Sequence, residues 1–231
     1  MSSMAATPRL RHHLVWLDEA GWAYAQSCAP DATHQQVLQR WQREQWPLVL
    51  RRADPDAAAD ELCAGLALPP DAHGDKLRIA VSVPQAHVRM SRAPLTLDEV
   101  IAARPALPAS WDALLLALQR ANLGLSVFGS LSWQVLTGQP YLRPQSDIDL
   151  LWQPTDHSAL ARGLPLLQHH AGLLPLDGEI VFADGDAVSW KEWVQACRSD
   201  ARVLVKGARG VRLERTDALH CAPREDERCP A

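Results

Sequence analysis

The stretch VFGSLSWQVLTGQPYLRPQSDIDLLW, residues 127–152, decides how the rest of the sequence is interpreted. Gly129 and Ser130 follow a short apolar run typical of a buried strand, and the helical pattern LSWQVLTG begins directly after them. The stretch then ends in SDIDLLW, where Asp147 and Asp149 stand at the start of a second apolar strand. Two carboxylates at this position require an explanation beyond packing, because charged groups are rarely buried without a partner.

Side chains alternate between the two faces of a strand, so Asp147 and Asp149 are expected on one side and Ile148 on the other. Their carboxylates repel each other unless a cation lies between them. Mg²⁺ suits such a pair, because it is commonly held by one or two carboxylates together with substrate phosphates. Gly129 allows close approach to a ligand, and Ser130 adds a hydroxyl at a helix N-terminus, where phosphates bind well. The combination predicts metal-assisted phosphoryl or nucleotidyl transfer, whereas an isolated Asp-x-Asp is also common in turns and on solvated strand faces.

Gly-Ser followed by Asp-x-Asp resembles the signature of the nucleotidyltransferase superfamily typified by DNA polymerase beta. The longer sequence around this motif is more similar to the phosphoribosyl-dephospho-CoA transferases, the holo-acyl-carrier-protein synthases of malonate decarboxylase. The segments that resemble this family are FGSLSWQVLTGQPYLRPQSDIDLLW, WPLVLRR, LPLDGEIVFADGDAVSWKEW and RVLVKGARGVRL. The likeness extends from about residue 10 to residue 214.

The resemblance implies a specific reaction. Such an enzyme transfers the prosthetic group of 2′-(5″-triphosphoribosyl)-3′-dephospho-CoA to a serine of the apo acyl-carrier subunit of malonate decarboxylase, and diphosphate leaves. It also implies that Asp147 and Asp149 bind one or two Mg²⁺ ions, with Mn²⁺ as an alternative, and that Gly129 and Ser130 hold the departing phosphates. A sister enzyme of citrate lyase uses the same cofactor chemistry, and the residues alone do not distinguish the two carriers.

Superfamily members commonly use a third carboxylate from a later strand, and Glu179 in LDGEIVF is the candidate for this role as base or second-metal ligand. The superfamily position is more often an aspartate. The alternative is that Glu179 is an ordinary surface residue of the strand. Asp184 and Asp186 are expected to be turn residues.

Three basic residues are candidates for cofactor binding. Lys206 is the one charged residue of the strand VLVKG. It is expected to contact a phosphate, to pair with the carboxylates or to be solvated. Arg51 and Arg52 close a strand and are expected either to hold the CoA diphosphate or to dock the carrier. Arginine suits phosphate recognition because its planar fork donates two parallel hydrogen bonds. However, the excess of twenty arginines over three lysines also fits a GC-rich genome.

The sequence predicts an α/β fold in two domains. Residues 1–90 are expected to form a small N-terminal α/β domain, in which GLALPP (residues 65–70) is expected to be a loop, with a linker in VPQAHVRMSRAPLTLDEV (residues 83–100). Residues 91–215 are expected to form the nucleotidyltransferase-like catalytic domain with a mixed sheet, because strand and helix patterns alternate there with a hairpin at ADGD. Residues 216–231 are expected to be a disordered tail.

Composition excludes several other classes. The net charge of −4 argues against a nucleic-acid surface, and no run of about 20 apolar residues predicts a membrane span. The N-terminus lacks the pattern of a signal peptide, so we expect a cytoplasmic protein without a membrane partner. Five cysteines without a CxxC pair predict neither a zinc site nor a disulfide framework.

Two alternatives share the motif. A nucleotidyltransferase that adenylylates a small molecule or a protein would use the same four residues and would need only ATP. A non-catalytic binding module with this fold should tolerate the loss of one aspartate, yet both Asp147 and Asp149 are present.

Overall fold

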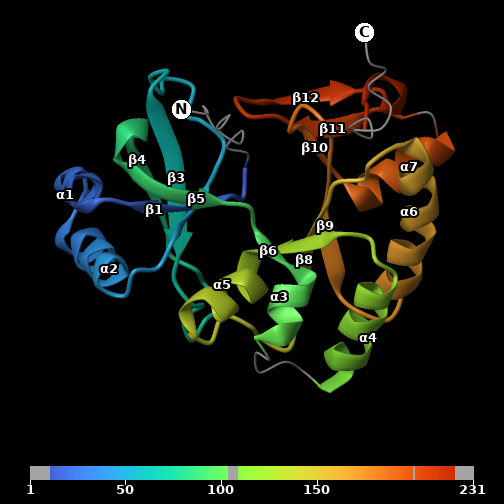
Figure 1. The fold of residues 1–231 in the computed structure, drawn as a ribbon, viewed down its shortest axis with the longest axis horizontal. Coiled ribbons are helices and arrows are strands. Elements are labelled where there is room, and N and C mark those ends of the chain that lie inside the picture. Colours follow the sequence, from blue (N-terminus) through green and yellow to red (C-terminus); the bar gives the residue numbers. More distant parts are fainter. Residues whose placement is uncertain (1–10, 104–108, 200, 222–231) are drawn as a thin grey trace, which may run out of the picture. The chain divides into compact units, whose positions relative to one another are not determined.

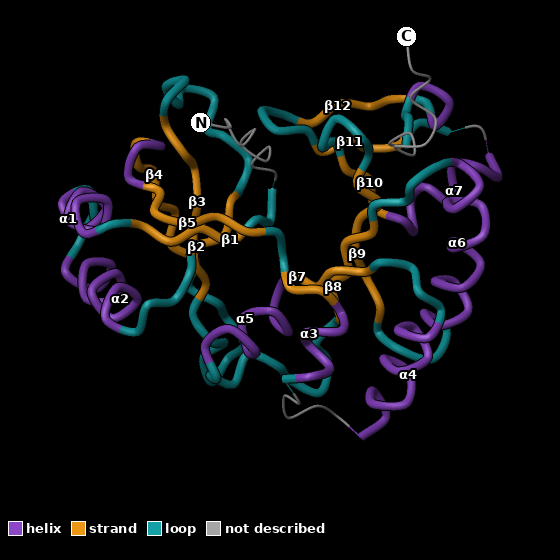
Figure 2. Tube along the Cα trace, viewed as in Figure 1, coloured by secondary structure: helices purple, strands orange, loops and turns teal. Residues whose placement is uncertain are grey.

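The computed structural model describes residues 11–103, 109–199 and 201–221, which form two compact units. The first unit ends at Ala93 and the second begins at Pro94, except that the segment Pro69–Asp75 belongs to the second. This division lies close to the boundary expected near residue 90. Each unit has a sheet of its own (Figures 1 and 2).

The first unit is a five-stranded antiparallel sheet with two helices. Both helices begin at an aspartate whose carboxylate accepts a backbone hydrogen bond, Asp18 from Gly21 and Asp31 from His34, which satisfies N–H groups of the first turn. The elements are β1 (Leu14–Leu17), α1 (Glu19–Ser27), α2 (Ala32–Arg43), β2 (Leu48–Leu50), β3 (Glu61–Ala67), β4 (Arg78–Pro84), the 3₁₀ turn η1 (Gln85–His87) and β5 (Val88–Arg92). The strand order is β4-β3-β2-β1-β5.

The second unit is built on a seven-stranded mixed sheet. Its elements are β6 (Leu95–Thr96), α3 (Leu97–Ala102), α4 (Ala109–Arg120), β7 (Leu125–Phe128), α5 (Gly129–Thr137), β8 (Ile148–Trp152), α6 (His157–Ala171), β9 (Leu176–Val181), β10 (Ala187–Ser189), α7 (Trp190–Ser199), β11 (Val203–Lys206), β12 (Val211–Glu214) and the 3₁₀ turn η2 (Thr216–Ala218). The strand order is β12-β11-β10-β9-β8-β7-β6. Strands β8 and β9 are parallel and are connected through α6, whereas the other strand pairs described are antiparallel. The predicted α/β class with a mixed sheet is therefore confirmed.

The two faces of this sheet differ in chemistry. On one face, alternate strand residues such as Ile148, Leu150 and Val205 are buried in a cluster to which all five helices of the unit contribute. In Figure 2, α4, α6 and α7 lie together on the same side of β8 and β9. The other face, termed the polar face below, carries Asp149, Asp177, Glu179 and Lys206, because side chains alternate along each strand.

One glycine of α6 fixes the far end of β8. A Cβ atom at Gly163 would lie 2.3 Å from the ring of Trp152, the last residue of β8. Only a glycine lets the helix approach the strand this closely. The strand that begins beside Asp147 is therefore anchored at its other end by the contact of an indole ring with a helix backbone.

Two segments differ from the sequence-based expectation. Residues 83–100 were expected to be a linker, but they form the end of β4, η1, β5, β6 and the first residues of α3, so that only Ala93 and Pro94 connect the units along this part of the chain. The segment GLALPP was expected to be a loop, but its first residues belong to β3, where Leu62, Ala64 and Leu66 are buried.

The first residues of the segment expected to be a disordered tail are structured. Residues 216–218 form η2, and Leu219 and Cys221 are buried in the core cluster of the second unit. Residues 222–231, the rest of the expected tail, lie outside the described residues. Among the helices described, none combines the length and the apolar character that a bilayer crossing requires.

Candidate active site

Helix α5 begins at Gly129 directly after β7, with its N-terminus against β8. Gly129 has a φ of +67°, a conformation that residues with a Cβ rarely adopt. A Cβ atom at this position would lie 1.9 Å from Oδ2 of Asp149. The group that comes close to Gly129 in the structure is therefore the Asp149 carboxylate, and binding of a ligand there stays a prediction. The adjacent Ser130 is buried in the first turn of the same helix.

The two aspartates of the motif lie at the start of β8. Asp147 is exposed and precedes the strand, Ile148 is fully buried, and Asp149 is half-buried and opposite Phe128 of β7. This sequence of exposure agrees with the predicted alternation, which placed Ile148 in the core and the carboxylates on the other side. The N-terminus of α5 carries a partial positive charge, which stabilises the Asp149 carboxylate beside it.

The parallel pairing of β8 with β9 brings a third carboxylate to this place. Asp177 is opposite Asp149 in the register, whereas Glu179 is opposite Leu151. Neighbouring strands lie about 4.8 Å apart, so Asp177 is next to Asp149 on the polar face. The sequence interpretation did not propose Asp177 and favoured Glu179 for its apolar neighbours. The register that places Asp177 opposite Asp149 involves two segments separated in the chain by α6.

Glu179 has a different environment from the one expected of a catalytic base. It is 5% exposed, and one carboxylate oxygen accepts a hydrogen bond of 2.8 Å from Nζ of Lys206 on β11. Lys206 thus pairs with a carboxylate, one of the roles that the sequence left open. Asp177 is half-exposed, so it is more accessible to a substrate than Glu179 is. Its carboxylate lies 3.6 Å from Nζ of Lys191 at the start of α7.

The carboxylates fit a magnesium ion that is completed by substrate. In the described part of the chain, no three His, Cys, Asp or Glu side chains are grouped so as to hold a metal ion by themselves. Mg²⁺ rarely occupies an all-protein cage and is usually bound by one or two carboxylates, water and substrate phosphates. Asp147 and Asp149 provide such a pair. The Asp149 carboxylate lies in the space that a Cβ at Gly129 would fill, directly beside the helix N-terminus.

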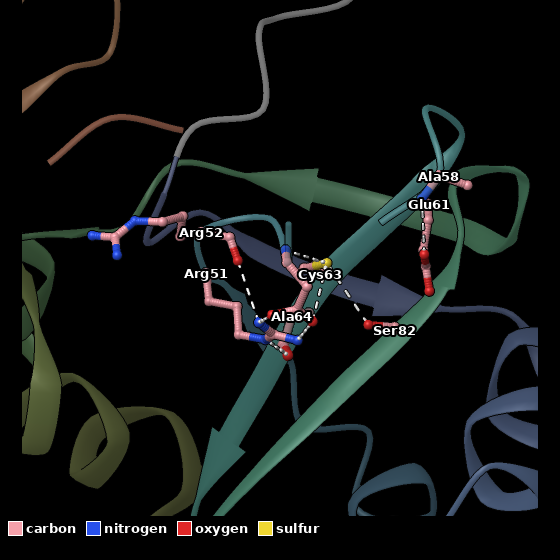
Figure 3. A network of polar contacts seen from close by, with 8 residues as sticks. Arg51, Arg52, Ala58, Glu61, Cys63, Ala64 and Ser82 are labelled. Atoms are coloured by element: carbon pink, nitrogen blue, oxygen red, sulfur yellow. Dashed lines mark hydrogen bonds and ion pairs between the residues drawn. The ribbon is translucent and has the colours of Figure 1, made fainter. Parts of the chain in front are cut away.

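Arg51 and Arg52 belong to the first unit and have different surroundings (Figure 3). Both terminal nitrogens of Arg51 donate to the Asp54 carboxylate at 2.5 Å, and its Nε donates to the Ala64 carbonyl at 3.0 Å. This pairing raises the pKa of Arg51 and lowers the pKa of Asp54, since each charge stabilises the other. Cys63 joins the same network through its thiol.

Arg52 points away from this network in Figure 3. Its Nε is buried and has no hydrogen-bond partner in the described residues. Of the two arginines proposed for phosphate binding, Arg51 therefore pairs with Asp54 and stabilises the loop after β2. Arg52 is the better candidate for a ligand, because its Nε has no hydrogen-bond partner in the described residues.

The aromatic residues near the motif serve packing. Tyr141 is fully buried, Trp133 is buried, and their rings stack with centroids 6.2 Å apart. This arrangement gives both rings a packing role.

Comparison with known proteins adds independent information. The family model for the phosphoribosyl-dephospho-CoA transferase MdcG N-terminal domain matches residues 10–94, and the model for the C-terminal domain matches residues 95–217. A phosphoribosyl-dephospho-CoA transferase from Xanthomonas euvesicatoria pv. vesicatoria is 38% identical over 88% of this chain and 92% of its own length. A protein of the same name from Bradyrhizobium diazoefficiens is 36% identical over 80% of this chain and 82% of its own length. Another, from Klebsiella pneumoniae, is 33% identical over 92% of this chain and 97% of its own length. No solved structure matches the chain. Since both family models match and these relatives cover most of its length, the chain belongs to the phosphoribosyl-dephospho-CoA transferase MdcG family.

Proposed function

We propose that this transferase attaches the prosthetic group of triphosphoribosyl-dephospho-CoA to a serine of the apo acyl-carrier subunit of malonate decarboxylase. The observation that supports this most directly is that the N-terminus of α5 lies against Asp149 of β8, which is opposite Asp177 of β9. Backbone donors for a phosphate therefore lie beside carboxylate ligands for a cation on the polar face.

The reaction forms one bond and breaks one. The serine Oγ of the carrier attacks the phosphorus next to the ribose, the bond from this phosphorus to the bridging oxygen of the diphosphate breaks, and diphosphate leaves with that oxygen. Mg²⁺, or Mn²⁺ in its place, would be held by Asp147 and Asp149 and would stabilise the charge on the attacking and leaving oxygens.

The residues of the chain supply binding and proton transfer. The backbone N–H groups at Gly129 and Ser130 bind the departing phosphates at the N-terminus of α5. We assign acceptance of the serine proton to Asp177 rather than to Glu179, because Asp177 is next to Asp149 and Glu179 is occupied by Lys206. Arg52 in the first unit remains the candidate for the cofactor phosphates.

Intact-mass spectrometry of the apo carrier tests the proposal. After incubation with this protein, Mg²⁺ and triphosphoribosyl-dephospho-CoA, the carrier should gain the mass of the phosphoribosyl-dephospho-CoA group. The gain should disappear with EDTA and with Asp149→Asn. If the carrier gains no mass and the protein instead releases diphosphate from ATP with another acceptor, the adenylylating alternative replaces this proposal.

A further inference from the structure

The edge of the sheet in the second unit exposes two large aliphatic side chains. Val211 and Leu213 of β12 are 52% and 58% exposed. Within the described residues β12 pairs with β11 alone, so it is the edge strand on this side of the sheet. Proteins normally protect an exposed apolar edge, and a patch left open is typical of an interaction site.

These two side chains lie on the same face of the sheet as the catalytic carboxylates. Val211 is opposite Lys206 in the register, and Lys206 reaches Glu179 on β9 with a 2.8 Å hydrogen bond. Leu213 is opposite Leu204, two residues before Lys206 and therefore on the same face. The polar face thus continues from Asp149 to β12. Four strand spacings of about 4.8 Å separate β8 from β12, or about 20 Å along a flat sheet.

Basic side chains surround the exposed pair. Residues 201–215 contain five basic residues and one acidic residue, in a chain whose net charge is −4. Arg212 pairs with Asp186, and Arg215 pairs with Asp217. Arg202 and Arg209 are exposed and have no ion pair in the part of the chain that is described, so their charges are available to a partner.

We propose that β12 and the β11–β12 turn, centred on Val211, Leu213 and Arg209, form the docking surface for the protein substrate. The occupant is an acidic protein with an apolar patch on its acidic face. This inference rests on the proposed function, because a carrier whose serine reaches Asp149 must lie over the polar face, and the polar face extends to β12. An apolar centre with a basic rim supplies contact area together with electrostatic attraction.

A second copy of the chain is a poorer occupant. Pairing of two β12 strands across a two-fold axis would place the same patch of both copies at the interface. Residues 201–215 carry five basic residues and one acidic residue, so each copy would bring a patch of like charge, which destabilises the pairing. An acidic partner removes this repulsion.

The test measures carrier binding and carrier turnover separately. Leu213→Ser and Arg209→Glu should each raise the Kd for immobilised apo carrier and the KM for carrier about tenfold, with kcat at saturating carrier and the affinity for triphosphoribosyl-dephospho-CoA unchanged. Leu173→Ser and Arg198→Glu are matched controls, because Leu173 is 61% exposed and Arg198 lies on α7, whose buried side packs on the opposite face of the sheet. Both controls should behave as the wild type. High salt should weaken wild-type binding more than binding by Arg209→Glu.

The possible results distinguish the two proposals. An unchanged carrier Kd in Leu213→Ser and Arg209→Glu, with wild-type transfer intact, refutes the docking surface and leaves the function. Carrier binding that depends on Leu213 and Arg209 without any mass gain refutes the function and supports the surface. If the wild type does not bind the carrier, both are refuted. If the substitutions instead dissociate a dimer in gel filtration, a second copy occupies the surface and the proposal is overturned.

Discussion

The carboxylate of Asp149 occupies the space in which any residue other than glycine at position 129 would place its Cβ atom. This contact joins the two halves of the motif, since Gly129 begins α5 and Asp149 belongs to β8. A phosphate bound at the helix N-terminus and a cation bound by the aspartates, as proposed above, would thereby meet at the same point. The geometry depends on the absence of one side chain.

Substitution of Gly129 by alanine should therefore affect activity more than stability. The added Cβ would push the Asp149 carboxylate away, and we expect transfer to the carrier to fall at least about a hundredfold. Gly138→Ala is the matched control, because Gly138 has a φ of +69° but no heavy atom within 4 Å of the added Cβ. Both changes should cost about 1–2 kcal/mol of unfolding free energy from the left-handed backbone alone. Equal loss of kcat/KM in both variants would show that the contact with Asp149 is unimportant.

Asp177 and Glu179 should respond differently to neutralisation. Asp177→Asn should lower kcat at least about a hundredfold with an unchanged Tm, because it removes the proton acceptor from a half-exposed position. Glu179→Gln should lower the free energy of unfolding by about 1–3 kcal/mol, because Lys206 loses its charged partner. The double variant Glu179→Gln with Lys206→Met should recover part of that loss. If Glu179→Gln keeps its Tm and loses turnover, the base is Glu179, as the sequence had suggested.

The adjacent arginines provide a test of cofactor binding. Arg51→Ala should lower the Tm, since it removes the hydrogen bonds to Asp54 and Ala64, and we expect a cost of about 1 kcal/mol. Arg52→Ala should leave the Tm unchanged and raise the KM for triphosphoribosyl-dephospho-CoA about tenfold. Calorimetry and steady-state kinetics on the two variants check this. An unchanged KM in Arg52→Ala would mean that Arg52 does not bind the cofactor.

Two buried histidines should make stability depend on pH. Burial lowers the pKa of His13 and of His170 below the ordinary value of 6.5, and the neighbouring His12 and His169 act in the same direction. The unfolded chain therefore binds protons that the folded chain does not. The free energy of unfolding should fall as the pH drops through about 6.5 and stop falling from this cause once the pH is below the pKa values of the folded state.

Urea unfolding at pH 7.5 and 5.5 measures this effect. The double variant His13→Gln with His170→Gln should lose less stability between the two pH values than the wild type. His73→Gln, at an exposed position, is the control and should keep the wild-type dependence. An unchanged dependence in the double variant would mean that other groups cause it.

The parts of the fold that the sequence predicted correctly are those with a strong local pattern. The run LSVF, the glycine after it and the alternation around Ile148 are local features, and β7, α5 and β8 follow them. Strand β5 was missed because VRMSR has no buried side chain and therefore no hydrophobic period to detect. In β3, Gly65 weakened the strand pattern, although a Cβ there would lie 2.9 Å from the Ile79 carbonyl oxygen of the neighbouring strand.

The active site shows the same division between local and non-local information. The sequence singled out Gly129, Ser130, Asp147 and Asp149 as candidates, because they belong to one continuous motif. It did not single out Asp177, because the choice between Asp177 and Glu179 depends on the register of β8 against β9. That register joins two segments that α6 separates in the chain, and no local pattern reports it.

The contact between Gly163 and Trp152 has a consequence for genetics. Trp152 lies three residues after Asp149, or about 10 Å along the strand, and on the opposite face of the sheet. A larger residue at position 163 would displace the indole ring, and with it the strand that positions the motif aspartates. In a screen for inactive alleles, substitutions of Gly163 should therefore accumulate alongside those of the motif aspartates, although Gly163 packs at the other end of β8.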